Sequence, residues 1–353
     1  MRRGAARPWP VTESQMDPFR PARQTKTRSR VWMLSRANAG SLVAAVTTSE
    51  SLLVWNSATN RKVTELPFHF IADPDCFAVS KDSRRCFGCL ESCHSWEAAK
   101  APGNGWVICL DLATGKPIWE RRDLKGERSV TLSPSGDRVF CGNSSGAEIV
   151  AAADGQRLGT VKGARRIVAS RFSNRMLVLK AVPELVTTDL QPVARLPRCK
   201  SPELLNAVFG KLSVLVAEPG KPLRCFSTDS GCLLWESAPM HVREIAYSRA
   251  RNCFYGHQFD ESAAESDRLI RWDSMTGKET EVCKLKTDGW VFIRDASRVL
   301  ATDGTCIDCQ SGRKLKRLSF PKEPNPFFKP ADAKSSFDRL AAWLSDNPRA
   351  QAN

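Results

Sequence analysis

Residues 106–120 read WVICLDLATGKPIWE, an apolar segment, a short polar turn and a second segment that carries a tryptophan. In the turn, the Asp111 side chain can accept hydrogen bonds from following backbone N–H groups. Gly115 can take the left-handed conformation that closes a tight connection between two strands. The stretch therefore predicts a β-hairpin.

The same pattern recurs along the chain in seven copies. Six copies place a residue suited to a positive φ at the turn: Asn60, Gly115, Gly155, Gly231, Gly277 and Gly312. The fourth copy has Gln191 and Pro192 there instead. From Asn60 to Gly312 there are six steps over 252 residues, a mean of 42. A period of about 40 to 50 residues is typical of the four-stranded blades of a propeller.

Two further strands are expected before each hairpin, as in SVTLSPSGDRVFCGN at residues 129–143. One such four-stranded unit cannot bury both faces of its sheet, but units packed side by side in a ring can. We therefore predict an all-β chain that forms a seven-bladed β-propeller of antiparallel blades over residues 31–320. Eight blades, or a partial eighth, is the alternative.

The regular placement of the turn residues indicates a structural role for them rather than catalysis by the aspartates. The predicted structural turn residues are Asp111, Thr114, Gly115, Gly231, Asp273, Gly277, Asp308 and Gly312.

These residues also carry a resemblance. VICLDLATGKPIWE resembles the tryptophan-docking repeat of quinoproteins, with Asp111, Thr114, Gly115 and Trp119 in register, and the Arg271-Trp272-Asp273 ending resembles that of WD repeats. The likeness implies a propeller and, from the quinoprotein side, a dehydrogenase with a quinone cofactor and calcium. Only Trp119 and Trp235 fill the docking position, and no adjacent cysteine pair exists, so we expect no cofactor.

The segments outside residues 31–320 have a different composition. Residues 1–30 carry eight basic and two acidic residues and no apolar stretch typical of a signal peptide, so we expect a disordered basic arm. Residues 321–353 combine a Pro-rich linker with either a C-terminal helix or half a blade. No apolar run reaches the ~18 residues that a membrane helix needs.

Thirteen cysteines in a chain of 353 residues do not suggest a disulfide-stapled secreted fold. Most lie in apolar runs, which favours a reducing, cytoplasmic location. Cys86, Cys89, Cys93 and His94 have ligand chemistry for zinc, but residues three apart on a strand point to opposite faces. The same parity applies to Cys306 and Cys309, so we expect no metal site.

No sequence motif for a nucleophile, a zinc protease or a phosphate loop is present, and no catalytic residue can be named. His69 and His241 are expected in links between blades, where histidine often caps a turn.

Two insertions offer the best functional signal, at residues 91–105 and 258–268. Both are expected between the second and third strands of a blade, on the face where loops on a rigid scaffold commonly carry recognition. The candidate partner-binding residues are His94, Trp96, Asp260, Glu261, Glu265 and Asp267.

The sequence thus favours a non-catalytic, monomeric interaction scaffold that binds a protein or peptide through loops on one face. One alternative is an enzyme, either quinoprotein-like or centred on the channel. The other is a propeller that binds nucleic acid through its basic arm, which needs a continuous basic surface beyond the arm.

Overall fold

The computed structural model describes residues 31–36, 42–47, 52–56, 59, 61–66, 77–91, 105–121, 123–124, 129–143, 145–201, 205–259, 267–285, 290–293, 296–301, 304–315 and 317. Every regular element within these ranges is a β-strand, which confirms the all-β class. The predicted arm at 1–30 and the predicted helix or half-blade at 321–353 lie outside the described residues.

The strands follow one another as antiparallel groups in chain order. The first three blades are β1 (Val31–Arg36), β2 (Leu42–Thr47), β3 (Leu52–Asn56) and β4 (Arg61–Leu66); β5 (Phe77–Val79), β6 (Arg85–Glu91), β7 (Gly105–Asp111) and β8 (Pro117–Arg121); and β9 (Ser129–Leu132), β10 (Arg138–Gly142), β11 (Gly146–Ala151) and β12 (Arg157–Lys162). The fourth and fifth are β13 (Arg166–Ala169), β14 (Arg175–Leu179), β15 (Glu184–Thr187) and β16 (Pro192–Arg195); and β17 (Asn206–Phe209), β18 (Ser213–Ala217), β19 (Lys221–Ser227) and the first half of β20 (Leu233–Ser248). The second half of β20 begins the sixth blade with β21 (Cys253–Phe259), β22 (Arg268–Asp273) and β23 (Glu279–Lys284), and β24 (Trp290–Ile293), β25 (Arg298–Ala301) and β26 (Cys306–Asp308) belong to the seventh.

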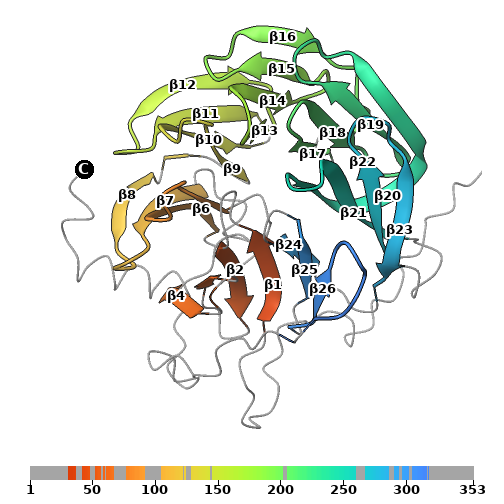
Figure 1. The fold of residues 1–353 in the computed structure, drawn as a ribbon. Coiled ribbons are helices and arrows are strands. Elements are labelled where there is room, and N and C mark those ends of the chain that lie inside the picture. The colour runs from red at the N-terminus through yellow and green to blue at the C-terminus, as the bar shows by residue number, and fades with distance from the viewer. Residues whose placement is uncertain are drawn as a thin grey trace, which may run out of the picture.

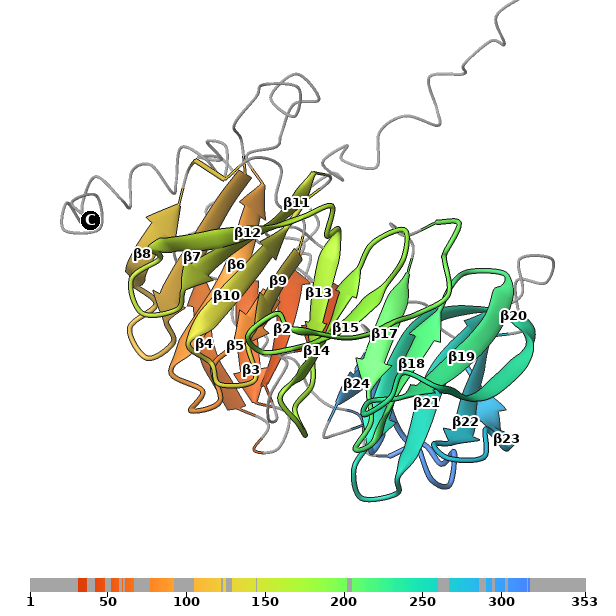
Figure 2. The ribbon, with the colours of Figure 1, turned by 90° about the horizontal axis from the view of Figure 1, so that it is seen from above.

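These groups are arranged around a common axis as a β-propeller (Figure 1). Seen from the side, the strands run between the two faces of the ring (Figure 2). We call the strands of each blade a, b, c and d from the centre outwards. The described residues contain seven such groups, the last with strands a to c and an isolated bridge from Ile307 to Lys314.

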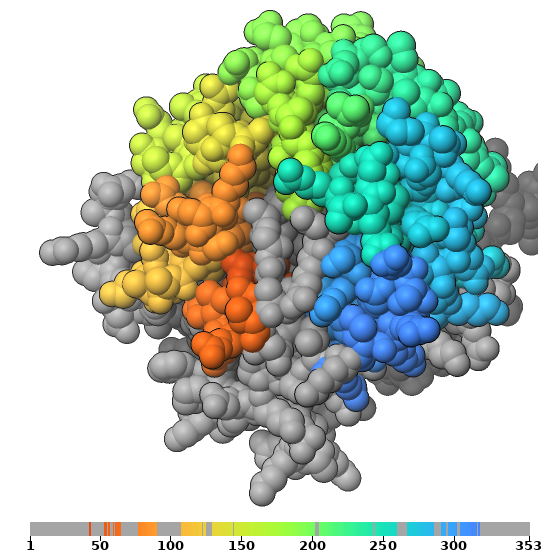
Figure 3. All heavy atoms as spheres, in the orientation of Figure 1, coloured from red at the N-terminus to blue at the C-terminus, as the bar shows by residue number. Residues whose placement is uncertain are grey.

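Buried side chains fill the space between neighbouring blades. One cluster joins Phe87 and Trp119 of the second blade to Val130 and Val139 of the third, and similar clusters follow at the next four interfaces. In the space-filling view the coloured blades from the second to the seventh follow one another in contact (Figure 3). Burying both faces of each sheet in this way explains why the repeat reads as apolar strands.

The ring closes between its first and last blades by side-chain packing. Val43 and Leu53 from β2 and β3 form one buried cluster with Val291, Ile293 and Leu300 from β24 and β25. Strand β1 lies beside β24 (Figure 1). Each described sheet pairs strands that are consecutive in the chain, so among the described strands none is exchanged across this seam.

Two sequence interpretations need correction. His241 lies where the fifth blade passes into the sixth, as expected, but it does not cap a turn, because the junction is inside the continuous 16-residue strand β20. Its ring packs edge-on against Phe259, with centroids 5.4 Å apart. In the fourth copy of the repeat, the left-handed residue is Leu190, at φ 61°, one position before Gln191. A leucine at positive φ is unusual, which explains why the sequence pattern did not identify this residue as the left-handed one.

Candidate functional site

The up-and-down order of the strands divides the connections between two faces. The a–b and c–d hairpins lie on one, which we call the turn face. The b–c loops and the connections from strand d to the next blade lie on the other, which we call the linker face. This division follows from antiparallel pairing alone, because each strand reverses the direction of the one before it.

The aspartates of the turn face are held in their own hairpins. Asp111 Oδ1 accepts hydrogen bonds from the backbone N–H of Ala113 at 3.0 Å and of Thr114 at 2.7 Å, and from the Thr114 hydroxyl at 2.9 Å. Asp273 and Asp308 accept the same three bonds from their own turns. The four glycines predicted for these turns have positive φ: 68° at Gly115, 69° at Gly231, 68° at Gly277 and 68° at Gly312.

Two tryptophans dock onto the turn of the following blade. Trp119 Nε1 donates to the carbonyl of Ala152 at 3.1 Å, and Trp235 Nε1 donates to the carbonyl of Ser274 at 3.1 Å. A Cβ atom on Gly155 would lie 2.8 Å from the Trp119 ring, and one on Gly277 would lie 2.6 Å from the Trp235 ring. Glycine is therefore required at these two turns for two reasons: the backbone has a positive φ, and the indole ring leaves no room for a Cβ atom.

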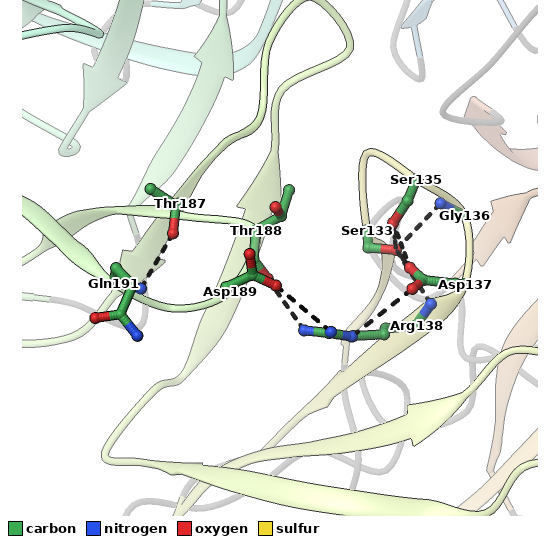
Figure 4. Close-up of polar contacts among 9 residues, drawn as sticks. All are labelled: Ser133, Ser135, Gly136, Asp137, Arg138, Thr187, Thr188, Asp189 and Gln191. Carbon is green, nitrogen blue, oxygen red and sulfur yellow. Dashed lines mark hydrogen bonds and ion pairs between the residues drawn. The ribbon is translucent and has the colours of Figure 1, made fainter.

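Arginines at the start of strand b join the same turns. Arg138 donates from Nη1 to the carbonyl of Thr188 in the next blade at 3.3 Å, and its Nη2 lies 3.5 Å from Asp189 (Figure 4). Arg85 reaches the carbonyl of Ala152, and Arg175 reaches that of Thr228, in the same way. These aspartates, tryptophans and arginines of the turn face are thus used within the ring.

The hydrogen bonds in these turns predict how stability depends on pH. The backbone N–H of Thr114 and then its hydroxyl lower the pKa of Asp111, and the backbone N–H of Thr276 lowers that of Asp273. A carboxyl with a lowered pKa in the folded state contributes stability above its unfolded value, about 3.9. That contribution is lost as pH falls through the folded pKa.

We expect the double variant Asp111→Asn, Asp273→Asn to be less stable than the wild type at pH 7, with the difference shrinking below about pH 4. Urea unfolding of both proteins from pH 7 to pH 3 measures it. A difference that stays constant over this range would mean that the two charges do not stabilise their turns.

The linker face holds the predicted partner-binding residues. Asp267, at the end of the sixth blade's b–c connection, has its Oδ2 2.7 Å from Nε2 of His257, which is buried. His94, Trp96, Asp260, Glu261 and Glu265 lie outside the described residues. The one predicted residue that the structure describes is thus engaged with a histidine of the neighbouring strand.

The sequence interpretation did not identify a strongly basic stretch of the described chain, which includes the fourth blade and the linkers on either side of it. Residues 157–200 contain ten basic residues and two acidic ones, Glu184 and Asp189, and so carry +8 of the chain's +15. Residues 129–156 carry −2 and residues 201–238 carry −1. A charge count taken blade by blade would have found this excess.

Backbone hydrogen bonds bring six of these basic residues into one region. The N–H of Arg165 donates to the carbonyl of Leu179 at 2.8 Å, and the N–H of Cys199 donates to the carbonyl of Ala181 at 2.9 Å. The two linkers that flank the fourth blade therefore lie against its b–c loop. We name this surface the basic rim; it consists of Lys162, Arg165, Lys180, Arg195, Arg198 and Lys200.

Two carboxylates bind groups of the basic rim. Glu184 lies between Lys180 Nζ, at 2.7 Å, and Arg195 Nε, at 3.3 Å. Glu218, which is 6% exposed, accepts hydrogen bonds from the backbone N–H of Lys200 at 2.9 Å and of Ser201 at 3.0 Å. The second carboxylate fixes the course of the linker that carries Arg198 and Lys200.

Four cations of the basic rim remain available. Lys162, Arg165, Arg198 and Lys200 are exposed, and within the described part of the chain no carboxylate lies within ion-pair distance of their side chains. At the inner end of the rim, Arg166 Nη2 donates to Asn206 Oδ1 of the fifth blade at 3.2 Å. The rim can therefore offer several neighbouring cationic groups to an anionic ligand.

The two cysteines of each pair point to different sides of their blade. Cys89 packs in one cluster with Phe87 and Cys109, whereas Cys86 alternates to the other face of β6. Cys306 packs toward the first blade, and Cys309 packs toward the sixth. Neither pair can place two thiols on one ion. Burial raises the pKa of Cys109 and of Cys225 to about 12, as expected for thiols that act as core side chains.

Among the described residues, no helix is long and apolar enough to cross a membrane.

Comparison with known proteins supports the fold. No family model matches the chain, and neither does any curated protein sequence. Among solved structures, the β-propeller domain of Cps50 (Swd1) from Myceliophteria thermophila is similar at a TM-score of 0.57 and 13% identity, covering 81% of this chain and 96% of that one. KlHsv2 with its loop 6CD replaced by a Gly-Ser linker gives a TM-score of 0.56 and 9% identity, covering 79% of this chain and 89% of that one.

An enzyme is also among the similar structures. Dihydro-heme d1 dehydrogenase NirN, in complex with DHE, gives a TM-score of 0.53 and 15% identity, covering 81% of this chain and 75% of that one. At such identities the similarity concerns the fold alone, and one fold hosts unrelated functions. The chain is therefore a β-propeller, and its function has to be argued from its own surface.

Proposed function

We propose that this protein is a non-catalytic interaction scaffold that binds a protein or peptide partner on its linker face. The observation that carries the proposal is a cluster of exposed cations on the linker face. Lys162, Arg165, Arg198 and Lys200 lie on the loops around one blade. The carboxylates and arginines described for the turn face, such as Asp111 and Arg138, are bound in turns and in contacts between blades.

A rigid ring is well suited to this role. Recognition residues placed on loops of a rigid scaffold lose little conformational entropy when they bind. The backbone of the basic rim is held by hydrogen bonds to Leu179, Ala181 and Glu218, so its cationic side chains extend from a fixed main chain. The insertions at 91–105 and 258–268 are proposed to add contacts on the same face.

Amine-reactive cross-linking with mass spectrometry tests which face binds. The linker face carries Lys162, Lys180, Lys200 and Lys221, and the turn face carries Lys81, Lys116, Lys211 and Lys278. We expect partners captured by the full chain from an extract of the producing cells to cross-link to the first set. The second set is the internal control, since it has the same size and chemistry. Cross-links concentrated on the turn-face lysines would refute the proposal.

A further inference from the structure

The basic rim has the chemistry of a binding site for carboxylates. Arginine and lysine at fixed positions bind carboxylates through charge-assisted hydrogen bonds, and arginine does so in a bidentate manner. The rim already holds one such group, because Glu184 lies between Lys180 and Arg195 at 2.7 and 3.3 Å. The neighbouring residues Arg165, Arg198 and Lys200 are exposed and carry guanidinium and ammonium groups of the same kinds.

From this we infer that the basic rim binds an acidic peptide segment, rich in Asp and Glu, of a partner protein. This inference rests on the proposed scaffold function and names the chemistry of the partner. Several exposed cations must act together, because a single exposed ion pair contributes only about 0 to 1 kcal/mol. The binding site is accordingly the whole rim between the third and fifth blades.

The surroundings of the basic rim favour a peptide over nucleic acid. Among the described residues, the large hydrophobic side chains that are exposed are Val63, Leu158, Leu212, Leu233 and Met275, and none is aromatic. The described rim therefore offers no stacking platform of the kind that single strands use. The exposed cations lie on the loops around one blade, between Lys162 and Lys200 in the chain. A short acidic segment fits a positive region one blade wide.

The test is a fluorescence anisotropy titration of the full-length protein with a labelled 16-residue peptide of alternating acidic and Ser/Gly residues. The rim variant is Arg165→Glu, Arg198→Glu. The matched control is Lys116→Glu, Lys278→Glu, which makes the same charge change at exposed positions of the turn face. Both variants keep the N-terminal arm. None of the four side chains is buried, so both variants are expected to fold. Thermal melts check this.

At about 50 mM salt we expect the rim variant to bind the peptide at least ~10-fold more weakly than the wild type, and the control within about 2-fold. Affinity should fall as salt rises, because the charges are exposed. The same peptide with Gln and Asn in place of Glu and Asp should not bind.

Three outcomes would overturn the inference: no binding of the acidic peptide at 50 mM salt, equal loss in both variants, or a 16-base-pair DNA duplex binding ~10-fold more tightly than the peptide with the same dependence on the rim. The last result would identify a nucleic-acid surface. If the peptide fails to bind while partner cross-links still map to the linker-face lysines, the scaffold function stands and only the acidic-peptide chemistry is wrong.

Discussion

Replacing Gly277 by alanine is expected to lower the free energy of unfolding by about 3 kcal/mol. An L-residue in the left-handed region costs roughly 1 to 2 kcal/mol, and Gly277 has a φ of 68°. The added Cβ would also lie 2.6 Å from the Trp235 ring, and overpacking of this kind costs about 1 to 3 kcal/mol. Urea unfolding at neutral pH measures the sum.

Gly163→Ala is the matched control, because Gly163 has nearly the same φ, 69°, and its Cβ would have no heavy atom within 4 Å. We expect this variant to lose only the backbone contribution of about 1 to 2 kcal/mol. The difference between the two variants therefore isolates the contact with Trp235. Equal losses at both positions would show that the indole does not constrain the turn.

The largest effect is expected for Trp119→Ala, which should destabilise the protein by about 4 kcal/mol. Trp119 is 3% exposed, packs in the cluster between the second and third blades, and donates its N–H to Ala152. Truncation leaves a cavity at an interface between blades, and packing at these interfaces is what holds the ring together. A denaturant titration reports the loss.

Trp119→Phe separates packing from hydrogen bonding. The aromatic ring is kept, and the Ala152 carbonyl retains its bond from Arg85, so we expect a loss of about 1 kcal/mol. If the alanine variant proves no less stable than the phenylalanine variant, the interface does not depend on this side chain.

The fold was predictable because the information for it is local. A hairpin such as 106–120 contains its own strands, its Asp turn and its glycine, and repetition at a mean of 42 residues implies stacking of equal units. The position of Trp119 relative to the Asp111–Gly115 turn could also be read from the sequence. Its docking partner, the Gly155 turn of the next blade, needed the structure, because the two residues belong to different repeats.

The candidate site was harder to predict because its parts are distant in sequence. Lys162 and Arg165 precede the fourth blade, and Arg198 and Lys200 follow it. Only the bonds of Arg165 to Leu179 and of Cys199 to Ala181 show that these segments share one surface. The sequence reading followed the insertions instead, because extra length is a signal that one chain displays directly. A charge excess becomes visible only when residues are grouped by blade.

Strand β20 has a consequence for local unfolding. Elsewhere among the described residues, a linker such as 196–205 separates the last strand of one blade from the first strand of the next, so one blade can open while its neighbour stays folded. Leu233–Ser248 is a single strand whose halves pair with β19 and β21, which makes the fifth and sixth blades one continuous seven-stranded sheet. Breaking the pairing on one side removes support from the other. We therefore expect these two blades to form one cooperative unit, whose backbone amides open to solvent together.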